Sequence, residues 1–232
     1  MHQTRKIFLG ISISIIITVI SFAISYYLSQ KYNYDLGMIV QIPFLLFTIP
    51  VVIYFKKKGE LDFKIKKLEA YSILKIFIIS YVISIFLQFI SGLTNALFNG
   101  PASKEVSIDL QLWLYVLTMF FITSIAEELL FRGFLLNMLD ALKNRKIMIF
   151  RLEISYSILL SGFVYGLVHL IYFIYGQHYA LIVSVAISAF AMGTLAGYFQ
   201  EKYENNFLAA VLTHMASMLV AITGIIVTVL IS

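Results

Sequence analysis

Residues 110–131 read LQLWLYVLTMFFITSIAEELLF, an apolar run that ends with two adjacent carboxylates, Glu127 and Glu128. A helix of about 20 apolar residues spans the hydrocarbon core of a bilayer, so this run predicts a transmembrane helix. Six other runs have similar length and character. The chain is therefore predicted to be an all-α, polytopic transmembrane bundle of about seven helices. The predicted spans are 7–28, 36–55, 71–90, 110–131, 155–174, 179–199 and 207–230.

The composition agrees with a membrane setting. Of the 232 residues, 61% are hydrophobic and 12% are charged, whereas a soluble domain is about half apolar and roughly a quarter charged. This balance excludes a water-soluble enzyme, a nucleic-acid-binding domain and a disordered chain. The absence of cysteine from the sequence excludes disulfides, thiolate metal sites and cysteine nucleophiles. The expected surroundings are a lipid bilayer, with no nucleic-acid partner.

The positive charges predict the orientation of the bundle. With the N-terminus in the cytoplasm and alternating spans, Lys31 and Lys104 alone of the 17 Lys and Arg residues fall outside. Such an excess on the inner side favours an N-in, C-out protein of the plasma membrane. The first span follows Arg5 and Lys6, is too long for a signal-peptide core and has no small-residue cleavage site. We therefore expect it to be retained as a signal anchor.

The chain is expected to form a single membrane domain over residues 1–232, since no loop is long enough to fold alone. Ala189, Gly193 and Gly197 recur at every fourth position of the sixth span. Such a ladder of small residues favours close helix packing. Any function must then depend on side chains within the membrane.

Ionisable side chains inside a span cost a few kcal/mol and by default mark a functional site. Glu128 and Arg132 are four residues apart, in the favourable order for an ion pair on one helix face. Glu127 lies about 100° around the helix and has no such neighbour. A desolvated, unpaired carboxylate can act as a general base or acid near neutral pH. A simpler alternative is that both glutamates sit among headgroups at the helix end.

Two histidines strengthen the functional interpretation. His169 shares a helix face with Gly162 and Gly166, whose small size should leave room beside the imidazole. His214 lies about 10 Å into the last span, at a depth comparable with Glu127. His169 falls in the outer half of its own span, which requires that helix to be tilted or to begin in the cytoplasm. A lone intramembrane histidine more often makes an interhelical hydrogen bond, but two histidines and an unpaired glutamate on three helices suggest a shared site.

Two mechanisms of water activation are compatible with one glutamate and two histidines. Glu127, His169 and His214 could hold a Zn²⁺ ion with one position open for water. Alternatively, Glu127 could activate a water as a base without metal, while the histidines donate to the developing oxyanion. The residue types do not separate these alternatives.

The motifs resemble those of the CPBP family of intramembrane proteases, also called Abi, which includes the type II CAAX prenyl endopeptidases and bacteriocin-processing or immunity proteins. Glu127-Glu128-Leu129-Leu130-Phe131-Arg132 matches the family's Glu-Glu-x-x-x-Arg motif. His169 matches its Phe-x-x-x-His motif, with Tyr165 in place of Phe, and His214 matches its C-terminal His motif. The resemblance extends over roughly residues 110–220, and residues 1–108 carry no family signature.

The resemblance implies a role for each residue. Glu127 would activate the attacking water together with His169. Glu128 and Arg132 would support the site, and His214 would hold the substrate carbonyl or the oxyanion.

One position departs from the family. Met218 stands four residues after His214, where the family has Asn or Asp, and a thioether cannot donate a hydrogen bond. Losing one oxyanion donor typically costs about two to three orders of magnitude in rate. Ser217, or less directly Thr213, could replace it. Tyr165 adds a hydroxyl near the site that a phenylalanine lacks.

These observations favour an endopeptidase that cleaves a small hydrophobic or leader-bearing peptide, or a membrane protein, near the cytoplasmic face. For a bacterial chain, a bacteriocin or peptide pheromone is favoured over a CAAX substrate. One alternative is a weak or inactive family member that acts as a bacteriocin-immunity protein or a signalling scaffold. Another is a small transporter with Glu127 and the histidines as a proton relay, although internal repeats and broken helices are not evident in the sequence.

Overall fold

The computed structural model describes residues 3–32, 40–98, 118–149, 151–171 and 179–231. In this part of the chain, η1, α6, η2 and α7 follow one another without a break, so they act as one helix over residues 118–138, which we call the α6 helix. Counted in this way, the described residues form seven helices besides the three-residue 3₁₀ helix η3. The predicted helical, polytopic bundle is confirmed. The elements are α1 (Gln3–Tyr32), α3 (Gln41–Lys57), α4 (Ala70–Leu97), η1 (Thr118–Thr123), α6 (Ser124–Glu128), η2 (Leu129–Leu135), α7 (Leu136–Met138), η3 (Asp140–Leu142), β1 (Lys146–Ile149), β2 (Leu152–Ser155), α8 (Tyr156–Val168), α9 (Tyr179–Lys202) and α10 (Phe207–Ile231).

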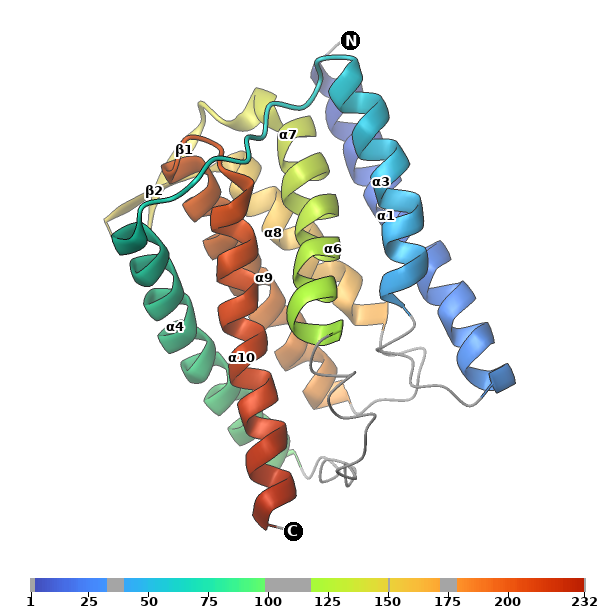
Figure 1. The fold of residues 1–232 in the computed structure, drawn as a ribbon, viewed down its shortest axis with the longest axis vertical. Coiled ribbons are helices and arrows are strands. Elements are labelled where there is room, and N and C mark those ends of the chain that lie inside the picture. Colours follow the sequence, from blue (N-terminus) through green and yellow to red (C-terminus); the bar gives the residue numbers. More distant parts are fainter. Residues whose placement is uncertain (1–2, 33–39, 99–117, 150, 172–178, 232) are drawn as a thin grey trace.

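The apolar helices make this a multi-pass membrane protein. Among the described residues, four helices are long and apolar enough to cross a bilayer, namely α1, α4, α9 and α10. The predicted spans 36–55, 110–131 and 155–174 each begin or end outside the described residues; α8 lies within the last of them, whereas α3 and the fourth helix overlap the first two and end beyond them. The two termini lie at opposite ends of the bundle (Figure 1), as an odd number of spans requires. The N-in, C-out orientation itself remains a prediction.

Two details differ from the sequence-based expectation. The segment before α8 was expected to be loop, but β1 and β2 form a short antiparallel hairpin in which Lys146 pairs with Ser155. The fourth helix was expected to end at residue 131, but it continues to Met138 and buries Arg132 completely. Arg132 is thus part of the bundle interior rather than an inner-face cation. Residues 130–139 are all buried by tertiary contacts, which a hydropathy count does not include, and these contacts account for the longer helix.

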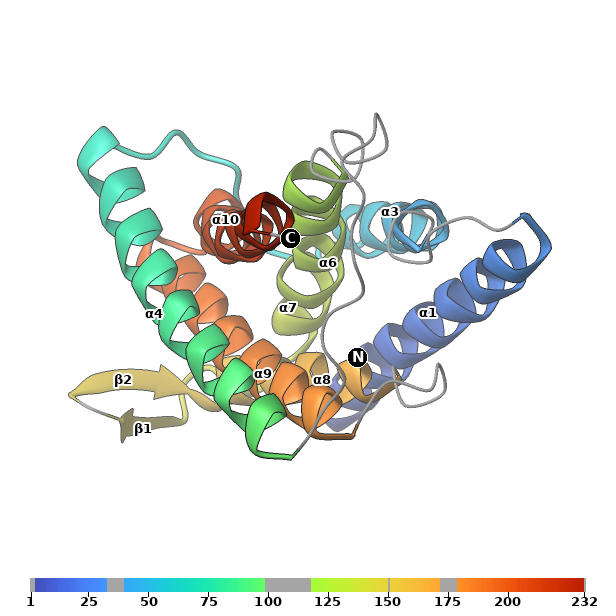
Figure 2. The same ribbon diagram turned by 90° about the horizontal axis from the view of Figure 1, so that it is seen from below.

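The α6 helix is the centre of the bundle. Seen along the helices, the α6 helix lies between α10 and α3, with α4 beyond α10, α1 beside α3, and α8 and α9 side by side in the lower part of the view (Figure 2). Its side chains Leu130, Phe134, Leu135 and Met138 are fully buried. Burial of side chains on every face of this second half of the helix requires neighbouring elements all around it.

Glycines bring α8 and α9 together. A Cβ on Gly162 would lie 2.6 Å from Thr194 Oγ1, and one on Gly166 would lie 2.8 Å from the carbonyl oxygen of Ala186. Both glycines therefore face α9 instead of leaving room beside His169, which corrects the expectation above. On α9, a Cβ on Gly193 would collide with the guanidinium of Arg132. The predicted close packing of the sixth span is confirmed at this position.

An extended segment between α3 and α4, residues 58–69, crosses the N-terminal end of the bundle (Figure 1). We call it the strap. Asn137 Oδ1 accepts from the backbone N–H of Asp62 at 3.1 Å and from Asn205 Nδ2 at 3.2 Å. The side chain of Asn206 donates to a backbone carbonyl of the strap at 2.9 Å. The strap is not part of a sheet, so its backbone N–H and C=O groups need other partners. The side chains of three asparagines provide them.

Candidate active site

The backbone of the α6 helix widens where the Glu-Glu-x-x-x-Arg motif lies. Its η1 and η2 stretches are π-helical, a rare geometry that often occurs at functional sites. Side chains from neighbouring elements bind the carbonyls of η2. Ser161 Oγ donates to the carbonyl oxygen of Phe131 at 3.0 Å. Asn137 Nδ2 and Gln200 Nε2 donate to that of Arg132 at 2.9 and 3.2 Å. These bonds hold the motif in a fixed position.

Glu128 is the buried, paired carboxylate of the motif. Its side chain is 1% exposed, with Arg132 Nε 3.2 Å from Oε2 and His214 Nδ1 3.0 Å from Oε1. The predicted ion pair with Arg132 is therefore present. The guanidinium of Arg132 also packs over the ring of Tyr165, with Cζ 4.7 Å from the ring centroid. A buried charge needs such partners because removal from water is costly.

Glu127 has a different environment from its neighbour. Its side chain is 17% exposed and lies 4.0 Å from His214 Nε2, measured from Oε2. The same oxygen accepts a hydrogen bond from the Tyr165 hydroxyl at 2.5 Å. Tyr165 occupies the position where the resembled family has Phe, so the additional hydroxyl does reach the site. Glu127 thus has a neutral donor and a nearby imidazole, while Arg132 on the same helix pairs with Glu128 instead.

His169 meets Glu127 at a small cavity. Glu127, Tyr165 and His169 line a space of about 20 Å³, which α1 closes with Thr18 and Phe22 and α3 closes with Phe44. A cavity needs at least about 10–15 Å³ and two or more polar partners to hold one water. His169 Nδ1 lies 2.8 Å from the carbonyl oxygen of Tyr165. Since a carbonyl accepts only, His169 Nδ1 carries a proton there.

The depth of His169 is explained by the shape of its helix. α8 has 13 residues and His169 is its C-cap, so the helix is about 20 Å long. It is inclined and ends near mid-height of the bundle (Figure 1). The expectation of a tilted helix is met, and His169 comes to the level of the other site residues.

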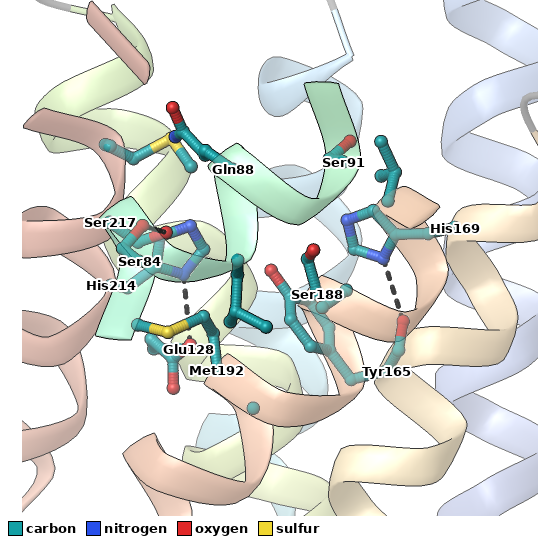
Figure 3. Close-up of a pocket in the computed structure, with 15 residues that line it drawn as sticks. Ser84, Gln88, Ser91, Glu128, Tyr165, His169, Ser188, Met192, His214 and Ser217 are labelled. Atoms are coloured by element: carbon teal, nitrogen blue, oxygen red, sulfur yellow. Dashed lines mark hydrogen bonds and ion pairs between the residues drawn. The ribbon is translucent and has the colours of Figure 1, made fainter. Parts of the chain in front are cut away.

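A larger cavity of about 230 Å³ adjoins these groups. His214 and His169 lie on opposite sides of it, with Ser188 between them (Figure 3). Glu128 and Tyr165 also contribute to its wall. We call this space the central cavity. Its position brings both histidines within reach of one bound molecule.

The α4 helix supplies a second wall of the central cavity, with Ser84, Gln88 and Ser91. These residues were not among the predicted site residues. The available signal was their spacing: polar side chains at intervals of four and three in a largely apolar helix mark one face. In Figure 3, Ser84 and Gln88 lie on the His214 side of the cavity and Ser91 lies on the His169 side.

Met218 and both of its suggested substitutes belong to α10. Met218 and Ser217 line the central cavity, and Ser217 Oγ lies 3.0 Å from Ser84 Oγ. The hydroxyl of Thr213 is fully buried and donates to the carbonyl oxygen of Ala209 at 3.0 Å. Thr213 therefore faces its own helix, and Ser217 is the α10 hydroxyl at the cavity.

The side chains do not form a metal site as they stand. Within the described ranges, no group of three or more His, Asp or Glu side chains has the arrangement to hold a metal ion. Glu127 Oε2 accepts the hydrogen bond of the Tyr165 hydroxyl at 2.5 Å. Glu127, His169 and His214 therefore do not fit the Zn²⁺ alternative in this arrangement.

Comparison with protein families agrees with the motif geometry. Residues 109–220 match the family described as Rce1-like, type II CAAX prenyl endopeptidase Rce1-like. This part of the chain belongs to that family. The resemblance drawn from the three motifs is confirmed, and the Rce1-like region includes the α6 helix, α8, α9 and the first part of α10. Comparison with curated proteins and with solved structures finds no match.

Membership implies a protease that acts on a peptide substrate. The Rce1-like region carries both glutamates and both histidines, whereas α1, α3 and α4 precede it. Those three helices nevertheless complete the two cavities, since α1 and α3 close the smaller one and α4 walls the larger one. The site is therefore assembled from both halves of the chain.

Proposed function

We propose that the chain is an intramembrane endopeptidase that cleaves a small peptide or a membrane-protein substrate near the cytoplasmic face of the plasma membrane. The observation that carries this proposal is the meeting of Glu127 and His169 at a cavity large enough for about one water. The central cavity, with His214 on its wall, is adjacent and offers space for the scissile peptide.

In the proposed reaction, Glu127 is the general base. Its carboxylate takes one proton from a water while the water oxygen attacks the substrate carbonyl. Tyr165 holds the carboxylate through its 2.5 Å hydrogen bond, and His169 Nε2 accepts from the second water proton. The tetrahedral intermediate then collapses, its C–N bond breaks, and Glu127 returns the proton to the departing amine. No net proton is gained or lost by the protein.

His214 is proposed to stabilise the oxyanion. Its Nδ1 faces the carboxylate of Glu128 at 3.0 Å, so a proton on Nε2 makes the ring an imidazolium balanced by that carboxylate. Arg132 in turn holds Glu128 from the other side at 3.2 Å. A prearranged donor aimed at developing charge is usually the largest single contribution to acyl-transfer catalysis.

Met218 supports a second candidate, a slow or inactive member that binds its peptide, as an immunity protein or scaffold would. Its thioether lines the central cavity and provides no donor. In this alternative the cavity retains a peptide without cleaving it.

The test compares peptide and protein termini by mass spectrometry in otherwise identical cells that express the wild type or Glu127→Gln at equal membrane levels. Glu204→Gln, an exposed carboxylate outside the site, is the matched control. Termini that occur with the wild type and Glu204→Gln, but not with Glu127→Gln, would support proteolysis and reveal a substrate. Identical termini in all three, with a cellular phenotype that Glu127→Gln retains, would favour the binding alternative.

A further inference from the structure

Two serines from different halves of the chain meet at the central cavity. Ser84 of α4 and Ser217 of α10 have their hydroxyl oxygens 3.0 Å apart, and either can be the donor. Ser84 is 2% exposed, whereas Ser217 is half-buried, and both line the cavity. Figure 3 shows the pair beside the ring of His214. The more accessible hydroxyl is thus the one on the helix that carries His214.

The direction of the hydrogen bond between Ser84 and Ser217 decides which of the two hydroxyl protons is left for a group in the cavity. Each hydroxyl has one proton and can accept through two lone pairs. Among the described residues, neither Ser84 nor Ser217 bonds to a helix carbonyl. If Ser84 donates to Ser217, the Ser217 proton remains available to a group in the cavity. The reverse direction would leave the free proton on the more deeply buried oxygen.

A second pair on the same helix differs in this respect. Ser91 of α4 lies 2.7 Å from Ser184 of α9, and Ser184 donates to the carbonyl oxygen of Leu181 at 2.8 Å. Ser91 must therefore donate to Ser184, so both protons are used. Of these two hydroxyl pairs, the one beside His214 keeps a donor for a ligand.

The Ser217 hydroxyl lies close to position 218, where the resembled family has a hydrogen-bonding Asn or Asp side chain and this chain has Met218. Ser217 lies three residues after His214, on the same helix face, and Met218 lies four residues after it. A hydroxyl at position 217 can therefore point into the same space that a donor at position 218 would serve.

We propose that Ser84 is a positioning residue for oxyanion stabilisation: its hydroxyl donates to Ser217 and directs the Ser217 proton into the central cavity, where it replaces the donor missing at Met218. This inference rests on the proposed protease function. It assigns a role to α4, which lies outside the region matched to the family. Ser217 would contact the reacting carbonyl, whereas Ser84 would act through Ser217.

The test uses purified protein in phospholipid nanodiscs and a quenched-fluorescence peptide synthesised around the most abundant wild-type-dependent terminus. Ser217→Ala should lower kcat about 100-fold, as for the loss of one oxyanion donor. Ser84→Ala should lower kcat about tenfold with little change in KM, since the donor remains but is less well oriented. The double variant should be no slower than Ser217→Ala, because the two residues act as one unit.

A second experiment introduces at position 218 the Asn side chain that the family has there. Met218→Asn should return Ser84→Ala to within a few-fold of the wild-type kcat, because the site then no longer depends on the serine pair. Ser80→Ala is the matched control and should keep the wild-type kcat, since Ser80 is a buried serine of α4 that does not line the central cavity. Size-exclusion profiles of all variants check that each remains folded.

The outcomes separate the two proposals. Three results would contradict the positioning role of Ser84: a wild-type kcat for Ser84→Ala, an effect that multiplies that of Ser217→Ala, or no rescue by Met218→Asn. If Glu127→Gln is inactive in the same assay, the protease function stands even so. If the termini comparison finds no wild-type-dependent cleavage, the protease function is overturned and this inference is overturned with it.

Discussion

The central cavity has two walls of opposite chemistry. One wall, from the Rce1-like region, carries Glu128, His169 and His214, with Arg132 buried behind it. The other, from α4, carries the neutral side chains of Ser84, Gln88 and Ser91. Buried charges must be held by partners that are themselves fixed, whereas hydroxyls and amides need only a few hydrogen bonds. The charged wall therefore depends on many other contacts, and the neutral wall can vary without unfolding the bundle.

The largest expected difference between the walls is in catalysis. Glu127→Gln removes the proposed base and should lower kcat/KM by about two to four orders of magnitude. Gln88→Ala, on the neutral wall, should change it by less than about tenfold. Cleavage of the quenched-fluorescence peptide measures both. A Glu127→Gln protein as active as the wild type would remove Glu127 from the mechanism.

The next difference is in stability. Arg132→Met leaves the carboxylate of Glu128 buried with one partner fewer, and breaking a buried ion pair in this way costs about 3–5 kcal/mol. We expect a much lower melting temperature in detergent. Arg151→Met, at an exposed turn residue, is the control. Adding Glu128→Gln to Arg132→Met should recover part of the loss, and an unchanged melting temperature for Arg132→Met would mean that the pair contributes little.

A glycine of α9 and a glycine of α4 give a smaller contrast. A Cβ at Gly193 would collide with Arg132 and lie 2.8 Å from Tyr165 Cδ1, whereas a Cβ at Gly92 on α4 would meet nothing within 4 Å. Gly193→Ala should therefore cost about 1–3 kcal/mol through overpacking. Gly92→Ala should leave the melting temperature unchanged or slightly higher. Equal effects at both positions would show that α9 moves away without cost.

The smallest expected effect lies outside both walls, at the strap. Lys66 hydrogen-bonds Glu204 at 2.8 Å and lowers the pKa of that exposed carboxyl. A lowered folded-state pKa stabilises the protein above the unfolded-state pKa, and the contribution is lost as the pH falls through the folded-state pKa. The wild type should therefore melt slightly above Glu204→Gln at neutral pH, and the gap should close in acid or high salt. A gap that persists at low pH would contradict this account.

The sequence was sufficient for features that depend on neighbouring residues along one helix. Apolar runs of membrane length predicted the helices, and the spacing of Glu128 and Arg132 predicted their ion pair. The motif residues also predicted the family, which the match over residues 109–220 confirms. The continuation of the fourth helix through Arg132 was missed, because hydropathy treats a buried arginine as the end of a span.

Contacts between side chains of different helices could not be predicted from the spacing of residues along one helix. The sequence determined which residues are costly to leave in lipid, since that cost belongs to each side chain and its place along its own helix. Tertiary structure alone decided which partners meet them: Tyr165 on Glu127, His214 on Glu128, and Ser84 beside Ser217. It also turned Gly162 toward α9 rather than toward His169. The physical reason is that helical periodicity fixes directions around one axis, while the relative rotation, tilt and depth of two helices depend on the packing of their side chains.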